Sequence, residues 1–103
     1  MHPGKLDDFK TLVQTAVNTV REKDSGTLQY DWFFNEDQSE CVLLECYRDS
    51  EVFLEHMANL GETLHALFSI SDVSAEVFGN PSEALLNAAA GIDIKLYSHF
   101  QGL

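Results

Sequence analysis

Positive charge is scarce in this sequence. Its 103 residues include six Lys and Arg against 17 Asp and Glu, so the formal net charge is −11 at pH 7. Nucleic acids and anionic membranes attract proteins through clustered Lys and Arg. We therefore expect neither as a partner. An acidic balance of this kind is typical of a solvated surface that keeps a protein soluble.

Cysteine and long apolar runs are scarce as well. The two cysteines, Cys41 and Cys46, lie five positions apart in one apparent strand, so they point to opposite faces and cannot easily form a disulfide. No CxxC or CxxH spacing is present. We expect buried free thiols and a reducing, cytoplasmic location. No apolar run approaches the length of a membrane span, and we expect no signal peptide.

The most informative feature is an apolar hairpin. Residues 27–35 and 40–47 read as strands, and the polar residues 36–39 form the turn. With Phe34 opposite Cys41, neither face is polar over its whole length. One layer of helices covers one face, so we expect a second copy of the chain to cover the other, in a homodimer through the sheet faces. In this register one face carries Leu28, Tyr30, Trp32, Phe34, Cys41, Leu43, Glu45 and Tyr47, and the other carries Gln29, Asp31, Phe33, Val42, Leu44 and Cys46.

Hydrophobic periodicity and turn residues predict the remaining elements. Asp49 or Ser50 caps a second helix, which carries apolar residues as far as Phe68, with a kink or break at Gly61. Asn80 is the predicted cap of a short helix. In chain order we expect a helix over 5–23, strands over 27–35 and 40–47, the second helix, a strand over 71–78, a helix over 81–90 and a strand over 93–100.

This order predicts a single α+β domain over residues 1–103, with an antiparallel sheet and helices on one face. It is close to the ferredoxin-like, split βαβ pattern. That pattern begins with a strand before the first helix, and here the first strand is truncated or absent. A missing strand leaves backbone donors and acceptors unpaired, which favours pairing with a partner chain.

Several short motifs share an order and spacing with a known family. They are PGKLDDF at residues 3–9, GTLQYDW at 26–32, NED at 35–37, ECYRDSE at 45–51, His56, and EVFG at 76–79. Together they resemble the antibiotic biosynthesis monooxygenase (ABM) family. The resemblance implies a homodimeric α+β barrel with a small-molecule cavity between sheet and helices. It also implies oxidation of quinols or polycyclic aromatics by dioxygen, without a metal or flavin.

Glu45 is the first candidate catalytic residue. It shares a strand face with Trp32 and lies opposite Tyr30 in the predicted register. A carboxylate buried among aromatic rings has a raised pKa and suits the abstraction of a proton from a phenol or quinol. Alternatively, Glu45 is a structural group that bonds to Tyr30 or forms an interface salt bridge, and Trp32 is a core residue.

His56 is the second candidate catalytic residue, because it borders the apolar stripe of the second helix. The alternative is a histidine that closes the edge of the core. We assign substrate binding to Tyr30, Trp32, Met57 and His65. His65 lies nine residues after His56, about 180° around the helix, so the two cannot share a metal, and we expect no metal site.

Three hypotheses for function follow. The first is a cofactor-independent monooxygenase-like protein acting on a small aromatic or quinol, with Glu45 and His56 as catalytic groups and no cofactor. The second is a non-catalytic homodimeric module of the same fold that binds a small ligand. The third follows from haem-degrading relatives of the fold, in which a lone histidine on this helix binds haem, as His65 would here.

Overall fold

Two separate two-stranded sheets form the β structure in the computed structural model, which describes residues 1–103. Strands β1 (Thr27–Phe34) and β2 (Cys41–Tyr47) pair antiparallel. Strands β3 (Ser74–Phe78) and β4 (Asp93–Tyr97) pair parallel. The β1–β2 hairpin and its helices confirm the predicted α+β class.

The extent of the sheet requires a correction. One antiparallel sheet was expected, but the later strands form their own parallel pair, and the chain does not close a barrel. In the split βαβ pattern, the strand before the first helix lies between the hairpin and the strand that follows the second helix. No strand precedes α1 (Leu6–Lys23), as predicted, and the two pairs are separate sheets.

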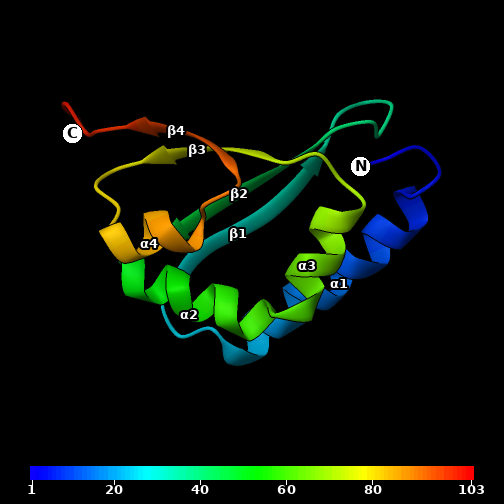
Figure 1. The fold of residues 1–103 in the computed structure, drawn as a ribbon, viewed down its shortest axis with the longest axis horizontal. Coiled ribbons are helices and arrows are strands. Elements are labelled where there is room, and N and C mark those ends of the chain that lie inside the picture. The colour runs from blue at the N-terminus through cyan, green and yellow to red at the C-terminus, as the bar shows by residue number, and fades with distance from the viewer. The chain divides into compact units, whose positions relative to one another are not determined.

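The contacts divide the chain into two compact units, Met1–Asp72 and Val73–Leu103. A single domain over residues 1–103 stays a prediction. The first unit carries three helices on one side of the hairpin (Figure 1). None of the helices of the structure is long and apolar enough to cross a membrane.

Helix α1 lies against α2 (Ser50–Leu60) and α3 (Glu62–Ser69). Its acidic first turn and basic last turn suit the helix dipole, as the sequence indicates. Gly61, with a φ of 47°, ends α2 and confirms the predicted break.

Helix α2 positions the central residue of the site. Asp49 caps it, because its side chain accepts a hydrogen bond of 2.9 Å from the Val52 amide. Val52, His56 and Leu60 follow at a spacing of four residues and are all buried. This buried stripe is part of the core of the first unit, in which α2 contacts both β1 and β2.

The hairpin register is the predicted one over most of its length. Phe34 pairs with Cys41 and Tyr30 with Glu45. An irregularity between Thr27 and Gln29 makes Leu28 an extra residue. The irregularity corrects the prediction that Leu28 shares a face with Tyr30, and the Leu28 side chain is 67% exposed.

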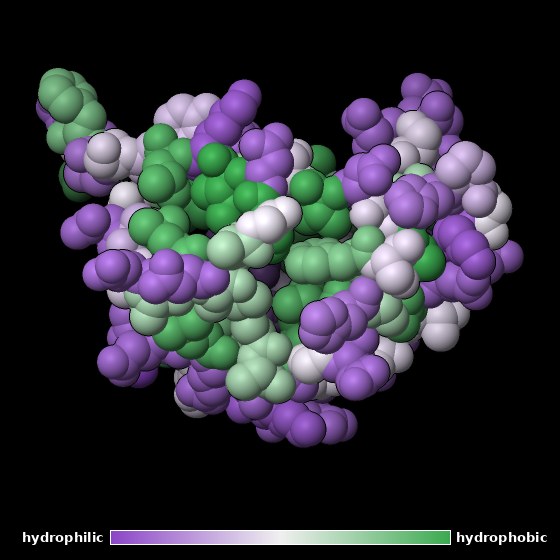
Figure 2. Space-filling model, in the orientation of Figure 1, coloured by the Kyte–Doolittle hydropathy of each residue, from purple (hydrophilic) through white to green (hydrophobic).

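The two faces of the hairpin have different surroundings. On the helix side, the Phe9 ring lies 6.0 Å from both the Trp32 and Phe34 rings. On the other face, apolar side chains remain exposed, and Figure 2 shows hydrophobic residues at the surface among hydrophilic ones. Those of the open hairpin face are Phe33 (51% exposed), Val42 (57%) and Leu44 (47%).

The second unit holds β3, α4 (Glu83–Ala88) and β4. Ser82, rather than the predicted Asn80, caps α4 by accepting a hydrogen bond of 3.1 Å from the Leu85 amide. The correction has a local reason, because the helix begins two residues later than the Asn-Pro signal indicates. All three elements are shorter than the ranges predicted for them.

Candidate functional site

A buried ion pair links the end of α1 to the middle of α2. His56 Nδ1 lies 2.7 Å from Asp24 Oδ2, and the side chains are only 3% and 2% exposed. The Asp24 carboxylate also accepts hydrogen bonds from the Thr27 hydroxyl at 2.7 Å and from the Asn59 amide at 2.8 Å. Three donors therefore satisfy this buried carboxylate.

Gly26 allows the loop after α1 to lie directly on α2. A Cβ atom at this position would lie 2.6 Å from Cγ2 of Val52, which is closer than real Cβ atoms come. The Gly26 carbonyl accepts a hydrogen bond of 3.2 Å from the Arg48 amide. The absence of a side chain at position 26 thus sets the approach that brings Asp24 to His56.

Glu45 lies on the other side of the imidazole. Its Oε1 is 3.5 Å from His56 Nε2, and it accepts a hydrogen bond from the Tyr47 hydroxyl. The Glu45 side chain is 30% exposed. The side chains of Asp24, His56, Glu45 and Tyr47 therefore form a continuous polar network, which we call the His56 network. It leads from a buried carboxylate to one that solvent reaches.

The electrostatics of the pair are self-consistent. Burial alone would lower the pKa of His56, but its hydrogen bonds with Glu45 and Asp24 and their negative charges outweigh burial and raise it. Burial alone would raise the pKa of Asp24, but hydrogen bonds from Asn59, Thr27 and His56, with the charge of His56, lower it. The two pKa shifts have opposite directions, and both favour the form of the pair in which an imidazolium faces a carboxylate.

Aromatic rings enclose the imidazole. Tyr30 and Tyr47 each have ring centroids 5.1 Å from that of His56, and Phe53 stacks on it at 6.0 Å. Burial, followed by the negative charge of Glu45, raises the pKa of both tyrosines. Both phenols consequently stay protonated, and the Tyr47 hydroxyl donates its hydrogen bond to Glu45.

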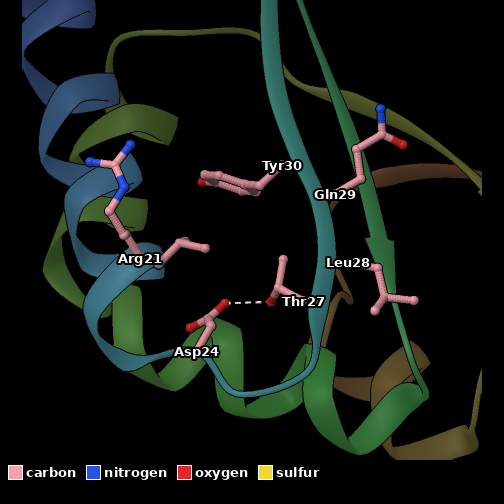
Figure 3. A pocket seen from close by; sticks show the side chains of 7 residues that line it. Arg21, Asp24, Thr27, Leu28, Gln29 and Tyr30 are labelled. Atoms are coloured by element: carbon pink, nitrogen blue, oxygen red, sulfur yellow. Dashed lines mark hydrogen bonds between the residues drawn. The ribbon is translucent and has the colours of Figure 1, made fainter.

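A pocket of about 260 Å³ adjoins this cluster, where α1 ends and β1 begins. Figure 3 shows Tyr30 pointing from β1 toward α1, and Asp24 joined to Thr27 by their hydrogen bond. Asp24 and Tyr30 belong to both the pocket and the buried cluster, so they connect the two. The pocket is lined by Val20, Arg21, Asp24, Thr27, Leu28, Gln29 and Tyr30.

The structure brings some of the predicted site residues together. Glu45, His56 and Tyr30 are neighbours, and the Trp32 ring lies 5.7 Å from that of Tyr30. Nε1 of Trp32 is buried and forms no hydrogen bond of normal geometry. It is still near enough to the Tyr30 hydroxyl to oppose the rise in the pKa of Tyr30.

Met57 and His65 lie apart from this cluster. Met57 follows His56 directly on α2, so its side chain leaves the helix about 100° away from the imidazole. His65 is exposed on α3, beyond the break at Gly61. No group of three or more His, Cys, Asp and Glu side chains that could hold a metal ion occurs in the structure.

Sequence reasoning missed Asp24, Asn59 and Tyr47. Asp24 reads as part of a helix-breaking turn, and Tyr47 as one more apolar strand residue. One signal was available, because His56 and Asn59 are three residues apart and share a helix face. Nothing local to the sequence shows that the loop at position 24 meets that face.

The fold and site are those of an α+β protein in which a buried histidine on α2 contacts the hairpin. The sequence profile of the family described as antibiotic biosynthesis monooxygenase matches residues 1–61, more than half of the chain. The chain belongs to this family. The matched residues include all four members of the His56 network. Searches of curated proteins and of solved structures find no significant match.

Proposed function

We propose that this protein is a cofactor-independent monooxygenase-like protein that oxidises a small aromatic or quinol substrate with dioxygen. The observation that carries the proposal is the Glu45 carboxylate, partly open to solvent and backed by His56, which Asp24 fixes at 2.7 Å. Membership of the antibiotic biosynthesis monooxygenase family supports the same reaction class.

In the proposed reaction, Glu45 accepts a proton from a substrate hydroxyl. The His56 cation and the protonated Tyr30 and Tyr47 hydroxyls stabilise the substrate anion. The electron-rich anion then reduces dioxygen. One oxygen atom bonds to a ring carbon and the other leaves as water, so the substrate supplies the electrons and protons. Surrounding rings limit the access of water.

The Glu45 position has a second consequence for the mechanism. Its Oε1 already accepts a hydrogen bond from Tyr47 and lies 3.5 Å from His56. A substrate hydroxyl therefore approaches the remaining oxygen, Oε2, or displaces the Tyr47 hydroxyl. Tyr47 stays protonated, so a Tyr47 hydroxyl displaced from Glu45 can donate its hydrogen bond to the substrate oxygen instead.

The second candidate is a non-catalytic homodimer that binds a small ligand. The exposed Phe33, Val42 and Leu44 favour a dimer through the open hairpin face, since a second copy would remove them from water. Oε1 of Glu45 already accepts a hydrogen bond from Tyr47, so it is less available as a base, which favours ligand binding without a reaction. His65 is exposed and adds no support for a haem-binding role. Cys41 is half-buried and Cys46 is exposed, so the prediction that both thiols are buried is wrong, but both are free, which fits a proposed cytoplasmic location.

Oxygen uptake with a panel of quinols and anthrones tests the proposal. We expect turnover in the wild type and a loss of about 10²–10⁴-fold in Glu45→Gln, the usual contribution of a general base. His65→Ala is the matched control and keeps wild-type turnover, because His65 is exposed outside the site. Unchanged turnover in Glu45→Gln would refute the site. Saturable binding of the panel without oxygen uptake would favour the second candidate.

A further inference from the structure

The pocket beside the His56 network is lined by a cation that forms no ion pair. Arg21, in the last turn of α1, is one of six Lys and Arg in a chain of net charge −11. Lys5 and Arg48 form ion pairs with Asp8 and Asp49, whereas Arg21 forms none. An unpaired guanidinium in so acidic a protein is available to a ligand.

The one carboxylate of the pocket lining does not cancel this charge. Asp24 is matched by the His56 cation at 2.7 Å, and its oxygens accept from Asn59 and Thr27 as well. The end of α1 adds a partial negative charge, but the Asp24 amide already caps the Val20 carbonyl at 3.1 Å. The uncompensated charge of the lining is therefore that of Arg21.

Two donors of the pocket lining already have acceptors within the protein. The Thr27 hydroxyl gives its proton to Asp24, and the Gln29 amide donates to Asp31 at 3.1 Å. The Tyr30 hydroxyl remains a phenol and donates to no acceptor in the structure. A guanidinium and a phenol O–H beside the apolar side chain of Val20 suit a ligand with acceptor oxygens on an apolar ring.

We propose that this pocket selects an aromatic carboxylate, with the Arg21 guanidinium pairing the carboxylate and Tyr30 donating a hydrogen bond to the same ligand. The volume of about 260 Å³ lies just below the range of about 300–1,000 Å³ usual for ligand pockets, so it suits one or two rings. Arg21 is thereby a specificity-determining residue. This inference rests on the proposed function for its claim that the ligand is the substrate.

The two ends of such a ligand would have separate tasks. Arg21 holds the carboxylate on the α1 side of the pocket, while Asp24 and Tyr30 border the cluster that contains His56. Tyr30 also pairs with Glu45 across the hairpin. A hydroxyl at the far end of the ring is therefore directed toward the proposed base, and the carboxylate fixes that orientation.

Binding of 2-naphthoate and its neutral isostere 2-naphthamide tests the proposal. Trp32 is the single tryptophan and lies 5.7 Å from Tyr30, so its indole N–H resonance reports on the site. We expect saturable shifts with 2-naphthoate and weaker binding of 2-naphthamide. Arg21→Gln should weaken 2-naphthoate about tenfold, the lower end expected for a charged hydrogen bond, and leave 2-naphthamide nearly unchanged.

Lys23→Gln is the matched control, because it removes the same charge from the same helix turn outside the pocket lining. It should change 2-naphthoate binding by less than about twofold, since exposed charges are screened. Equal effects of the two variants, equal wild-type affinity for the two probes, or no saturable shift would each overturn the proposal. The probes are not quinols, so the two tests are separate. Arg21-dependent binding of 2-naphthoate, together with no oxygen uptake from the panel of quinols and anthrones, would refute only the monooxygenase function.

Discussion

Asp24 and His56 are 32 residues apart in sequence, yet their Oδ2 and Nδ1 atoms lie 2.7 Å apart in a buried ion pair. This contact fastens the loop after α1 to the middle of α2. It also fixes the imidazole between Asp24 and Glu45. The site is therefore part of the core of the first unit, and its stability and its chemistry depend on the same hydrogen bonds.

The pair predicts a stability that depends on pH in two directions. The pKa of His56 is raised above its usual 6.5, so its contribution is full below pH 6.5 and is lost as the pH rises through the folded pKa. The pKa of Asp24 is lowered below 3.8, so its contribution is present above pH 3.8 and is lost as the pH falls through the folded pKa. The pair therefore stabilises most between these values.

Urea unfolding at several pH values and one protein concentration measures this dependence. Above pH 6.5 the free energy of unfolding should fall by at most about 1.4 kcal/mol per pH unit for the one proton of His56. His56→Gln should remove this slope. His65→Ala should retain it, because His65 is exposed. A slope that persists in His56→Gln would contradict the assignment.

Asp24→Asn should strongly destabilise the protein. The change keeps the shape of the side chain but leaves the buried His56 without its carboxylate, which typically costs about 3–5 kcal/mol. Asp72→Asn is the control, since Asp72 pairs with His2 through a side chain that is fully exposed. It should alter the free energy of unfolding by less than about 1 kcal/mol. Similar losses in the two variants would show that burial of the pair is unimportant.

Gly26→Ala should destabilise through contact with Val52. The new Cβ would lie 2.6 Å from a methyl group whose rotamer is stiff, and overpacking of this kind typically costs about 1–3 kcal/mol. In a Val52→Ala background the same change should cost little, because the clashing methyl groups are gone. A double-mutant cycle by chemical denaturation measures this coupling. Additive effects would mean that position 26 tolerates a side chain.

Leu44→Asp should shift any dimer toward the monomer. Leu44 is 47% exposed on the open hairpin face, where a charge would have to be buried on association. Sedimentation velocity at micromolar concentration distinguishes the two states. The control is Leu103→Asp, at the exposed C-terminal end, which should leave the sedimentation coefficient unchanged. A wild-type monomer would refute the proposed dimer.

The sequence predicted much of the fold because its signals are local. The apolar stripe of α1, the alternation in β1 and β2, and the turn residues between them each act within a few positions. The Tyr30–Glu45 pairing followed from the length of the turn. The sequence did not predict the bulge at Leu28 or the Ser82 cap, because neither feature changes the hydrophobic pattern.

By itself, the sequence determined the element types, the break at Gly61, and the family to which the chain belongs. Only the tertiary structure decided that Asp24 becomes the partner of His56, and that β3 and β4 pair with each other. Periodicity records which face of an element is apolar, but not which distant element covers it. A buried charge is matched by whichever group the packing brings within hydrogen-bond distance, and here the close approach of Gly26 to Val52 brings Asp24.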